Sequence, residues 1–174
     1  MKTLIIYDSK YGTTKTYAEM ISKELSIPIK DIKETGDTEI KDIEAVIIWT
    51  YVRVGTFHAQ SWIKQHWNIL KDKKICLFST SAEATKSELQ AILHKTFAPE
   101  DVQHITYFSF PGVSDYNRLT RFDKILLWFP IQSLKAKARK WDEKAAQAAE
   151  SLKHICGHID EESIIPLVEY IRNS

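Results

Sequence analysis

Short apolar runs alternate along this chain with longer segments in which apolar residues recur at helical spacing. The runs are rich in β-branched residues, which is typical of strands buried on both faces of a parallel sheet. Pro28 gives the second run the character of an edge strand, because proline has no backbone N–H to donate. We predict strands at residues 3–7, 27–32, 45–51, 74–79 and 104–110.

The segments between these runs have the apolar stripe of amphipathic helices. The first predicted helix buries Ala18, Ile21 and Leu25, and a later helix opens at Ser87. That later helix turns four apolar side chains inward: Leu89, Ile92, Leu93 and Phe97. The most regular stripe is predicted as one helix with Ala59, Trp62, Ile63, His66, Trp67 and Leu70 on one face. This alternation predicts an α/β fold, a parallel sheet covered on both faces and joined by right-handed crossovers.

Residues 118–149 interrupt this alternation. They are predicted to form one or two extra helices, 120–129 and 131–149, broken near Pro130. A final helix is expected at 164–171, with Ser163 as its N-cap and Pro166 in its first turn. The whole chain, residues 1–174, is therefore interpreted as one domain with a helical insert after the fifth strand.

The composition indicates an ordinary globular protein. Of 174 residues, 44% are hydrophobic and 27% are charged, and the net charge of +1 does not favour a nucleic-acid partner. Two cysteines, Cys76 and Cys156, are too few for a disulfide framework, and Cys76 is expected in the core. The N-terminal apolar run is too short for a signal peptide, and no apolar stretch is long enough to span a membrane. We therefore expect a cytoplasmic protein.

The loop between the first strand and the first helix is a candidate anion site. Backbone N–H groups and the helix dipole favour an anion at a helix N-terminus, and Gly12 lets the backbone approach a ligand. Further groups for a phosphate are the hydroxyls of Ser9, Thr13 and Thr14 and the ammonium group of Lys10. The loop matches neither the Walker pattern nor GxGxxG, and its length suits a single terminal phosphate. An ordinary helix cap rich in serine and threonine is the alternative interpretation.

Two further loops, residues 50–56 and 79–83, follow predicted strands. In an open parallel sheet, ligands bind outside the carboxyl ends of the strands, where the strand order reverses. Trp49, Tyr51 and Phe57 add aromatic groups at this edge. A phosphate site with aromatic neighbours suits a flat, phosphorylated and partly apolar ligand, and FMN has these properties.

Residues 7–19, YDSKYGTTKTYAE, resemble the phosphate loop and first helix of flavodoxins. Three further segments, 50–58, 115–127 and 164–171, are similar to the flavodoxin-like branch that contains menaquinone-dependent protoporphyrinogen oxidase. The resemblance covers nearly the whole chain. It implies a five-stranded sheet of order 2-1-3-4-5 that binds FMN non-covalently. It also implies an oxidoreductase that passes electrons from a protoporphyrinogen-like substrate to a quinone.

The same resemblance assigns the cofactor contacts by position. The phosphate would be held by Ser9, Tyr11, Gly12, Thr13 and Thr14. The isoalloxazine would lie against Thr50, Tyr51, Val52, Arg53, Val54 and Gly55. The third wall would be Ser79, Thr80, Ser81 and Ala82.

Two residues are candidates for a catalytic role. Arg53 would stabilise negative charge at the N1–O2 edge of reduced flavin and raise its two-electron potential. The alternative for Arg53 is a solvent-exposed loop charge. His58 follows the flavin loop and would supply protons to a quinone.

Other histidines are interpreted as structural. His66 lies on an apolar helix stripe and is expected to be a satisfied core histidine. His154 and His158 have the i, i+4 spacing of metal ligands, but Gly157 weakens a helix there and no second ligand pair is present. No metal site is therefore predicted.

The insert combines basic and aromatic residues. Residues 118–140 contain seven Lys or Arg and one acidic residue, Asp123, for a local net charge of +6. Interleaved Leu, Ile, Phe and Trp make this the composition of a membrane-surface helix, so contact with the inner membrane surface is one expectation. A lid that admits a quinone to the flavin, or an ordinary helix packed on the core, would show the same pattern.

Three functions are weighed on these grounds. The first is an FMN-dependent oxidoreductase that uses a quinone. The second is an electron-carrier flavodoxin that shuttles electrons between redox partner proteins, and the third is a flavin-free interaction module on the same fold.

Overall fold

The computed structural model describes residues 1–53, 55–81, 85–138, 147, 155–156 and 158–173. The chain divides into two compact units, each described here by itself. Unit 1 contains Met1–Gly112 and Ile159–Ser174, and unit 2 contains Val113–His158.

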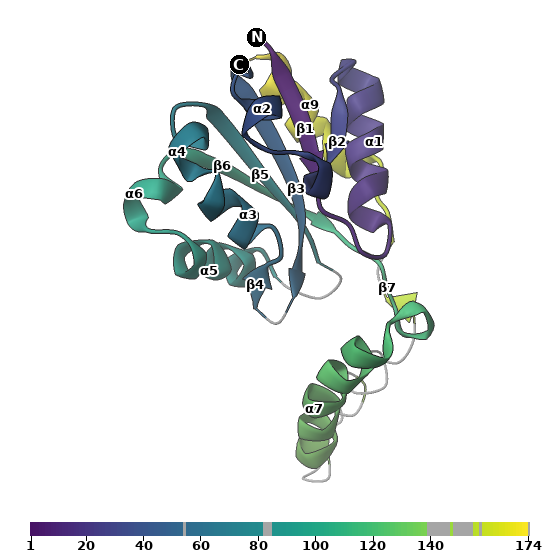
Figure 1. The fold of residues 1–174 in the computed structure, drawn as a ribbon. Helices are drawn as coiled ribbons and strands as arrows, with labels where there is room; N and C mark the ends of the chain where they lie inside the picture. Colours follow the sequence, from purple (N-terminus) through teal and green to yellow (C-terminus); the bar gives the residue numbers. More distant parts are fainter. Residues whose placement is uncertain (54, 82–84, 139–146, 148–154, 157, 174) are drawn as a thin grey trace. The chain divides into compact units, whose positions relative to one another are not determined.

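Unit 1 is built on a parallel sheet in which the strands follow the order β2-β1-β3-β5-β6 (Figure 1). These strands are β1 (Thr3–Tyr7), β2 (Ile29–Asp31), β3 (Ala45–Arg53), β5 (Lys74–Ser81) and β6 (Ile105–Pro111). A short strand, β4 (Thr56–Phe57), pairs antiparallel with the end of β3. Counted over the five parallel strands, the order is 2-1-3-4-5, so the expected flavodoxin-like α/β fold is confirmed.

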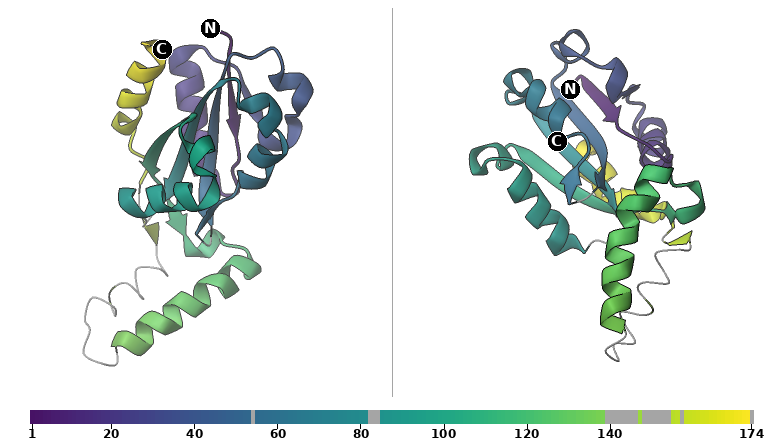
Figure 2. Two further views of the ribbon diagram at one scale, coloured as in Figure 1. Left: turned by 90° about the vertical axis from the view of Figure 1, so that its left-hand side faces the viewer. Right: turned by 60° about the horizontal axis from the view of Figure 1, so that its bottom comes forward.

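Helices cover both faces of this sheet (Figures 1 and 2). Successive residues of a strand point to opposite faces, so Leu4 and Ile6 enter one core cluster and Ile5 enters the other. The first cluster packs against α3 (Gln60–Gln65), α4 (Trp67–Leu70) and α5 (Lys86–Thr96). The second packs against α1 (Thr13–Leu25) and α9 (Ile165–Arg172). The remaining elements of unit 1 are η1 (Ile32–Glu34), α2 (Asp37–Ile40), α6 (Pro99–Val102) and η3 (Glu162–Ile164).

Three helix predictions in unit 1 need correction. The stripe from Ala59 to Leu70 forms two short helices, because His66 leaves the helical region with φ −99° and ψ 10°. α5 begins one residue before Ser87, and its cap is Thr85, whose Oγ1 accepts the N–H of Glu88 at 3.3 Å.

The cap predicted for the last helix is also wrong. Ser163 lies within η3 and donates its hydroxyl to the carbonyl of Asp160 at 2.6 Å. The residue at the N-cap of α9 is Ile164, which makes no side-chain capping bond. Serine satisfies a nearby carbonyl here as readily as it would cap a helix.

Unit 2 contains β7 (Ser114–Asp115), η2 (Tyr116–Arg118), α7 (Arg121–Ala138) and β8 (Ile155–Cys156), and β7 pairs antiparallel with β8. The predicted break near Pro130 is wrong, because α7 passes through this position as one helix of 18 residues. A proline removes one N–H donor from the helix, and the remaining backbone bonds suffice to continue it. The expected helix 131–149 continues into residues that lie outside the described part of the chain.

Candidate functional site

The first predicted loop lies between β1 and α1, at the carboxyl edge of the sheet. α1 begins at Thr13 with Gly12 as its N-cap, and no side chain caps it. The first turn therefore offers backbone N–H groups to a ligand. Gly12 has φ 101°, and a Cβ placed there would meet no atom within 4 Å. Its own N–H donates to Ser9 Oγ at 3.1 Å, which closes the loop in a form suited to an anion.

Lys10 and Tyr11 form the outer part of the same loop. The Lys10 ammonium nitrogen lies 5.3 Å from the centroid of the Tyr11 ring, within the range of a cation–π contact. The Thr13 side chain is half-buried at the start of the helix. The loop thus brings together a cation and several hydroxyl groups, the donor set that a phosphate prefers.

Buried hydroxyl groups connect the first and third loops. Thr14 Oγ1 lies 3.1 Å from Thr80 Oγ1, and both residues are buried. Ser79 is also buried, and its hydroxyl bonds to that of Tyr107 on β6. These bonds hold α1, β5 and β6 together at the edge of the sheet where the loops emerge.

The second predicted loop is a hairpin. β3 extends to Arg53, which lies opposite Thr56 of β4. Gly55 makes the turn with φ 69°, in the left-handed region that favours glycine. The Thr56 hydroxyl donates to the Arg53 carbonyl at 3.0 Å. Val54, which was also expected at the flavin, lies outside the described residues.

The hairpin is anchored through the two residues that precede it in β3. Thr50 is fully buried, and its Oγ1 accepts the N–H of Ala59 at 3.0 Å. Tyr51 is half-buried, and its ring stacks on His58 with centroids 4.6 Å apart and planes at 18°. Val52, the next residue, lies opposite Phe57. The hairpin therefore presents one aromatic ring, that of Tyr51, backed by an imidazole.

His58 forms a short contact with Asp8, a residue that the sequence analysis did not single out. The His58 Nδ1 atom lies 2.6 Å from Asp8 Oδ2. The Asp8 side chain is only 5% exposed, whereas that of His58 is 45% exposed. Asp8 directly follows β1, and its backbone N–H donates to the Trp49 carbonyl at 2.8 Å. Its position just after a buried strand was the available signal, because side chains there face the ligand edge of a parallel sheet.

Two of the three aromatic residues expected to face the ligand are in the core. Trp49 and Phe57 are at most 1% exposed. The Trp49 ring packs between Tyr17, Phe78 and Phe110, with centroids 4.9–5.7 Å away. Trp49 and Tyr51 share one face of β3, but Trp49 still pairs with Tyr7 of β1, whereas Tyr51 lies beyond the end of β1. Tyr51 alone of the three lies partly exposed.

The last positions considered in the sequence are Ser81, Ala82, His66 and His154. Ser81 ends β5, and Ala82 lies outside the described residues. His66 has the structural partner that was expected, because its Nδ1 atom lies 2.6 Å from Asp37 Oδ1. His154 is outside the described part of the chain, and within that part no three His, Cys, Asp or Glu side chains gather as metal ligands.

Burial shifts two titratable groups in the sheet. It raises the pKa of Tyr107 to about 12, although the hydrogen bond from Ser79 acts in the opposite direction. It also raises the pKa of Cys76 to about 11, against the smaller effect of the Lys74 charge. Both groups are therefore neutral at physiological pH, and Cys76 is buried as expected.

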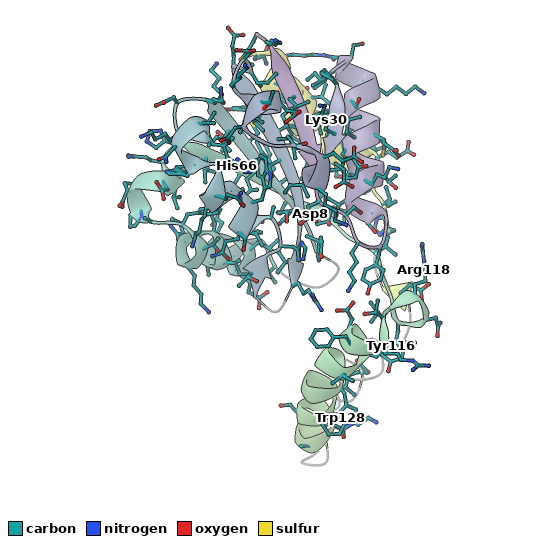
Figure 3. The ribbon with its side chains drawn as sticks, viewed as in Figure 1. Asp8, Lys30, His66, Tyr116, Arg118 and Trp128 are labelled. Atoms are coloured by element: carbon teal, nitrogen blue, oxygen red, sulfur yellow. The ribbon has the colours of Figure 1, made fainter. Side chains whose placement is uncertain are left out.

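Fold and loops together are suited to a phosphorylated planar cofactor at the carboxyl ends of β1, β3 and β5 (Figure 3, in which Asp8 marks this edge). The chain matches the flavodoxin domain family over residues 4–140 and belongs to that family. FMN is the cofactor of flavodoxin domains. The residues present fit it: the uncapped start of α1 and the open space at Gly12 suit its phosphate, and the Tyr51 ring suits its planar part.

Solved structures share this architecture. One is the Trp repressor binding protein of Bacillus subtilis, with 11% identity, a TM-score of 0.50 and coverage of 64% of this chain and 85% of that chain. Another is a flavoprotein of Lactobacillus acidophilus in complex with FMN, with 18% identity, a TM-score of 0.46 and coverage of 63% of this chain and 91% of that chain. A third is oxidised flavodoxin 2 of Bacillus cereus, with 21% identity, a TM-score of 0.46 and coverage of 63% of this chain and 84% of that chain. No curated protein matches the chain. At 11% identity, the likeness to the Bacillus subtilis protein concerns the fold alone.

Among the described residues, none of the helices combines the length and the apolar character that crossing a bilayer requires.

Proposed function

We propose that this chain is an FMN-dependent oxidoreductase that passes electrons from a protoporphyrinogen-like substrate to a quinone. Bound FMN would supply the electron transfer, while the protein would hold it and handle protons. Reduction of a quinone to a quinol takes up two electrons and two protons. A proton-exchanging side chain at the cofactor edge is therefore the feature that distinguishes this function from simple electron carriage.

The observation that carries the proposal is the Asp8–His58 pair. The His58 Nδ1 and Asp8 Oδ2 atoms are 2.6 Å apart. A hydrogen bond donated by Nδ1 to the carboxylate would fix the ring tautomer that leaves Nε2 as the proton-exchanging nitrogen. Stacking on Tyr51 holds the ring plane. The pair lies at the carboxyl end of β1 beside the hairpin, the region where the planar part of FMN is expected. His58 would thus donate protons to a quinone, and Asp8 would be its positioning residue.

Arg53 is proposed to act on the cofactor's charge. It ends β3 at the hairpin, where its guanidinium would stabilise negative charge on the reduced cofactor. Such stabilisation raises a reduction potential and favours accepting electrons from an organic substrate.

The alternative function is an electron carrier that exchanges electrons between redox proteins. Membership of the flavodoxin family favours it. A carrier moves electrons without protons, so it would not depend on the Asp8–His58 pair.

The experiment compares two activities of the FMN-loaded protein under anaerobic conditions. One is protoporphyrinogen oxidation with a menaquinone analogue, and the other is electron transfer to a protein acceptor through a reductase-coupled assay. We expect the first to fall about 100-fold in the Asp8→Asn and His58→Gln variants, the size of a lost acid–base contribution, while the second stays unchanged. Equal rates of quinone-dependent turnover in wild type and variants would refute the oxidoreductase assignment and favour the carrier.

The chain offers a matched control. His66, labelled in Figure 3, and Asp37 form a second imidazole–carboxylate pair with the same 2.6 Å separation, and neither residue belongs to the three loops. Asp37→Asn makes the same chemical change as Asp8→Asn, and it is expected to leave both activities unchanged. Circular dichroism and FMN affinity, measured by quenching of flavin fluorescence, show whether each variant keeps its fold and its cofactor.

A further inference from the structure

One face of α7 carries large apolar side chains into solvent. Phe122, Ile125 and Trp128 are 62%, 59% and 54% exposed. Their i, i+3, i+6 spacing places them within an arc of about 120° on the helix, at about 100° per residue. Exposure of this size at three neighbouring positions is uncommon in a protein that makes no further contact. We refer to these three residues as the α7 apolar face.

Basic side chains border this face. Arg121 and Lys135 are exposed and Lys124 is half-buried. At about 100° per residue, Lys124 and Lys135 fall about 20–40° outside the arc on the Trp128 side, and Arg121 falls between Trp128 and Ile125. The helix therefore combines exposed apolar side chains with ammonium and guanidinium groups along one edge, an arrangement that suits a helix lying in the plane of a membrane surface.

The acidic residue of the segment is turned away from this face. Asp123 is 7% exposed, and its Oδ2 atom accepts the Thr120 hydroxyl at 2.9 Å. Ile131, about 80° from Asp123 around the helix, is 5% exposed. The carboxylate thus helps to cap the start of α7.

Charge is distributed unevenly along the chain. Residues 118–140 have seven basic and one acidic residue, a net charge of +6, while the other 151 residues have 17 basic and 22 acidic residues, a net charge of −5. An anionic surface would attract the insert and repel the remainder of the protein. The net charge of the whole chain is close to zero, although the insert and the rest of the chain carry opposite net charges. Such a separation of charge orients a protein at a charged surface.

We propose that α7 docks on an anionic lipid surface, with Phe122, Ile125 and Trp128 inserted at the headgroup boundary and the flanking basic side chains on lipid phosphates. α7 has 18 residues, so it is about 27 Å long and lies along the surface. A second copy of the chain fits the face less well, because a two-fold interface would bring the basic residues of both copies together. The inference does not depend on the proposed function, since it needs neither FMN nor an electron acceptor.

The experiment measures flotation of the full chain with vesicles of phosphatidylcholine, made with and without phosphatidylglycerol. We expect co-flotation with the anionic vesicles only, decreasing as salt is raised. Ile125→Ser should weaken binding at least fivefold. Ile165→Ser is its control, because Ile165 on α9 is 52% exposed against 59% for Ile125, and it should bind as wild type does.

A second pair of variants separates specific from general charge effects. Arg121, Lys124 and Lys135 are replaced together by Gln, and three exposed lysines of unit 1, Lys23, Lys64 and Lys95, are replaced in the control. Both variants lose three positive charges. At about fivefold per basic residue near an anionic surface, the first should bind about 100-fold more weakly and the second almost unchanged.

Three results would overturn the proposal. One is the absence of flotation with anionic vesicles, and another is an equal loss in each variant and its control. The third is a wild-type dimer in light scattering that Ile125→Ser dissociates, which would assign the face to a second copy. Brominated lipid provides an independent reading, because it should quench tryptophan fluorescence in the wild type and much less in Trp128→Phe.

Discussion

Replacing Gly12 by alanine tests how the phosphate loop is built. A Cβ at this position would meet no atom within 4 Å, so the substitution introduces no steric clash. The whole effect should come from the backbone, which holds φ at 101° and ψ at −30°. Non-glycine residues in such sparsely populated regions cost about 1–3 kcal/mol. We expect the free energy of unfolding of Gly12→Ala to fall by that amount, with a midpoint about 2–12 °C lower on heating.

Two other glycines of unit 1, Gly55 and Gly36, supply the controls. Gly55 has φ 69°, closer to the left-handed well that non-glycine residues do visit, so Gly55→Ala should cost about 1 kcal/mol. Gly36 has φ −131°, an ordinary extended value, and its added Cβ would lie 3.7 Å from Glu39 Oε2. Gly36→Ala should change stability by less than about 1 kcal/mol, since weaker capping and lower unfolded-state entropy act in opposite directions. Urea unfolding of the cofactor-free protein measures the free energy of unfolding of all three variants. A Gly12→Ala variant as stable as Gly36→Ala would refute the inference that the backbone at Gly12 requires glycine.

Three further predictions use neighbouring groups. Thr14→Val and Thr80→Val should each lower the free energy of unfolding by about 1–3 kcal/mol, because each leaves a buried hydroxyl without its partner. The double variant should lose less than the sum of the two, and additive losses in urea unfolding would contradict the 3.1 Å bond. Between pH 10 and about 12 the unfolded chain loses the Tyr107 proton while the folded chain keeps it, so the free energy of unfolding should fall as pH rises through this window. The free energy of unfolding of Tyr107→Phe should fall less over the same pH window, and identical pH profiles of the variant and the wild type would argue against the raised pKa. Arg53→Ala should lower the two-electron potential of the FMN-loaded protein in spectroelectrochemical titration, and an unchanged potential would remove Arg53 from the cofactor's environment.

The strands were predictable because their sequence pattern reflects burial directly. A run such as Thr3–Tyr7, apolar at nearly every position, is stable only between two helical layers, and the structure places it there. The point at which a helix ends was harder to predict. Pro130 has the local signature of a break, but α7 continues through it because one missing donor is outweighed by the rest of the helix.

The candidate site could be placed by sequence only as a set of loops. Strand ends and a glycine at a helix start are local features, and they identified the edge of the sheet. Asp8 and His58 are 50 positions apart, and Thr14 and Thr80 are 66 positions apart. Such pairs depend on how the strands are ordered and in which register they align, and no spacing rule within one sequence gives that information. The burial of Trp49 likewise depends on its pairing with β1, because Trp49 lies opposite Tyr7 and Tyr51 lies beyond the end of that strand.

The two imidazole–carboxylate pairs of this chain show why geometry has to be read together with burial. Both have a nitrogen–oxygen distance of 2.6 Å, but their exposure is reversed: Asp8 and His58 are 5% and 45% exposed, whereas Asp37 and His66 are 66% and 10% exposed. A buried imidazole with an exposed carboxylate links α2 to the end of α3 and has no route to a substrate. In the Asp8–His58 pair the carboxylate is buried and the imidazole is exposed. The carboxylate therefore holds the ring from inside the protein, while the ring itself stays accessible to solvent. Only the second arrangement can pass a proton to a molecule that arrives from outside, and it is found at the edge of the sheet where flavodoxin domains bind FMN.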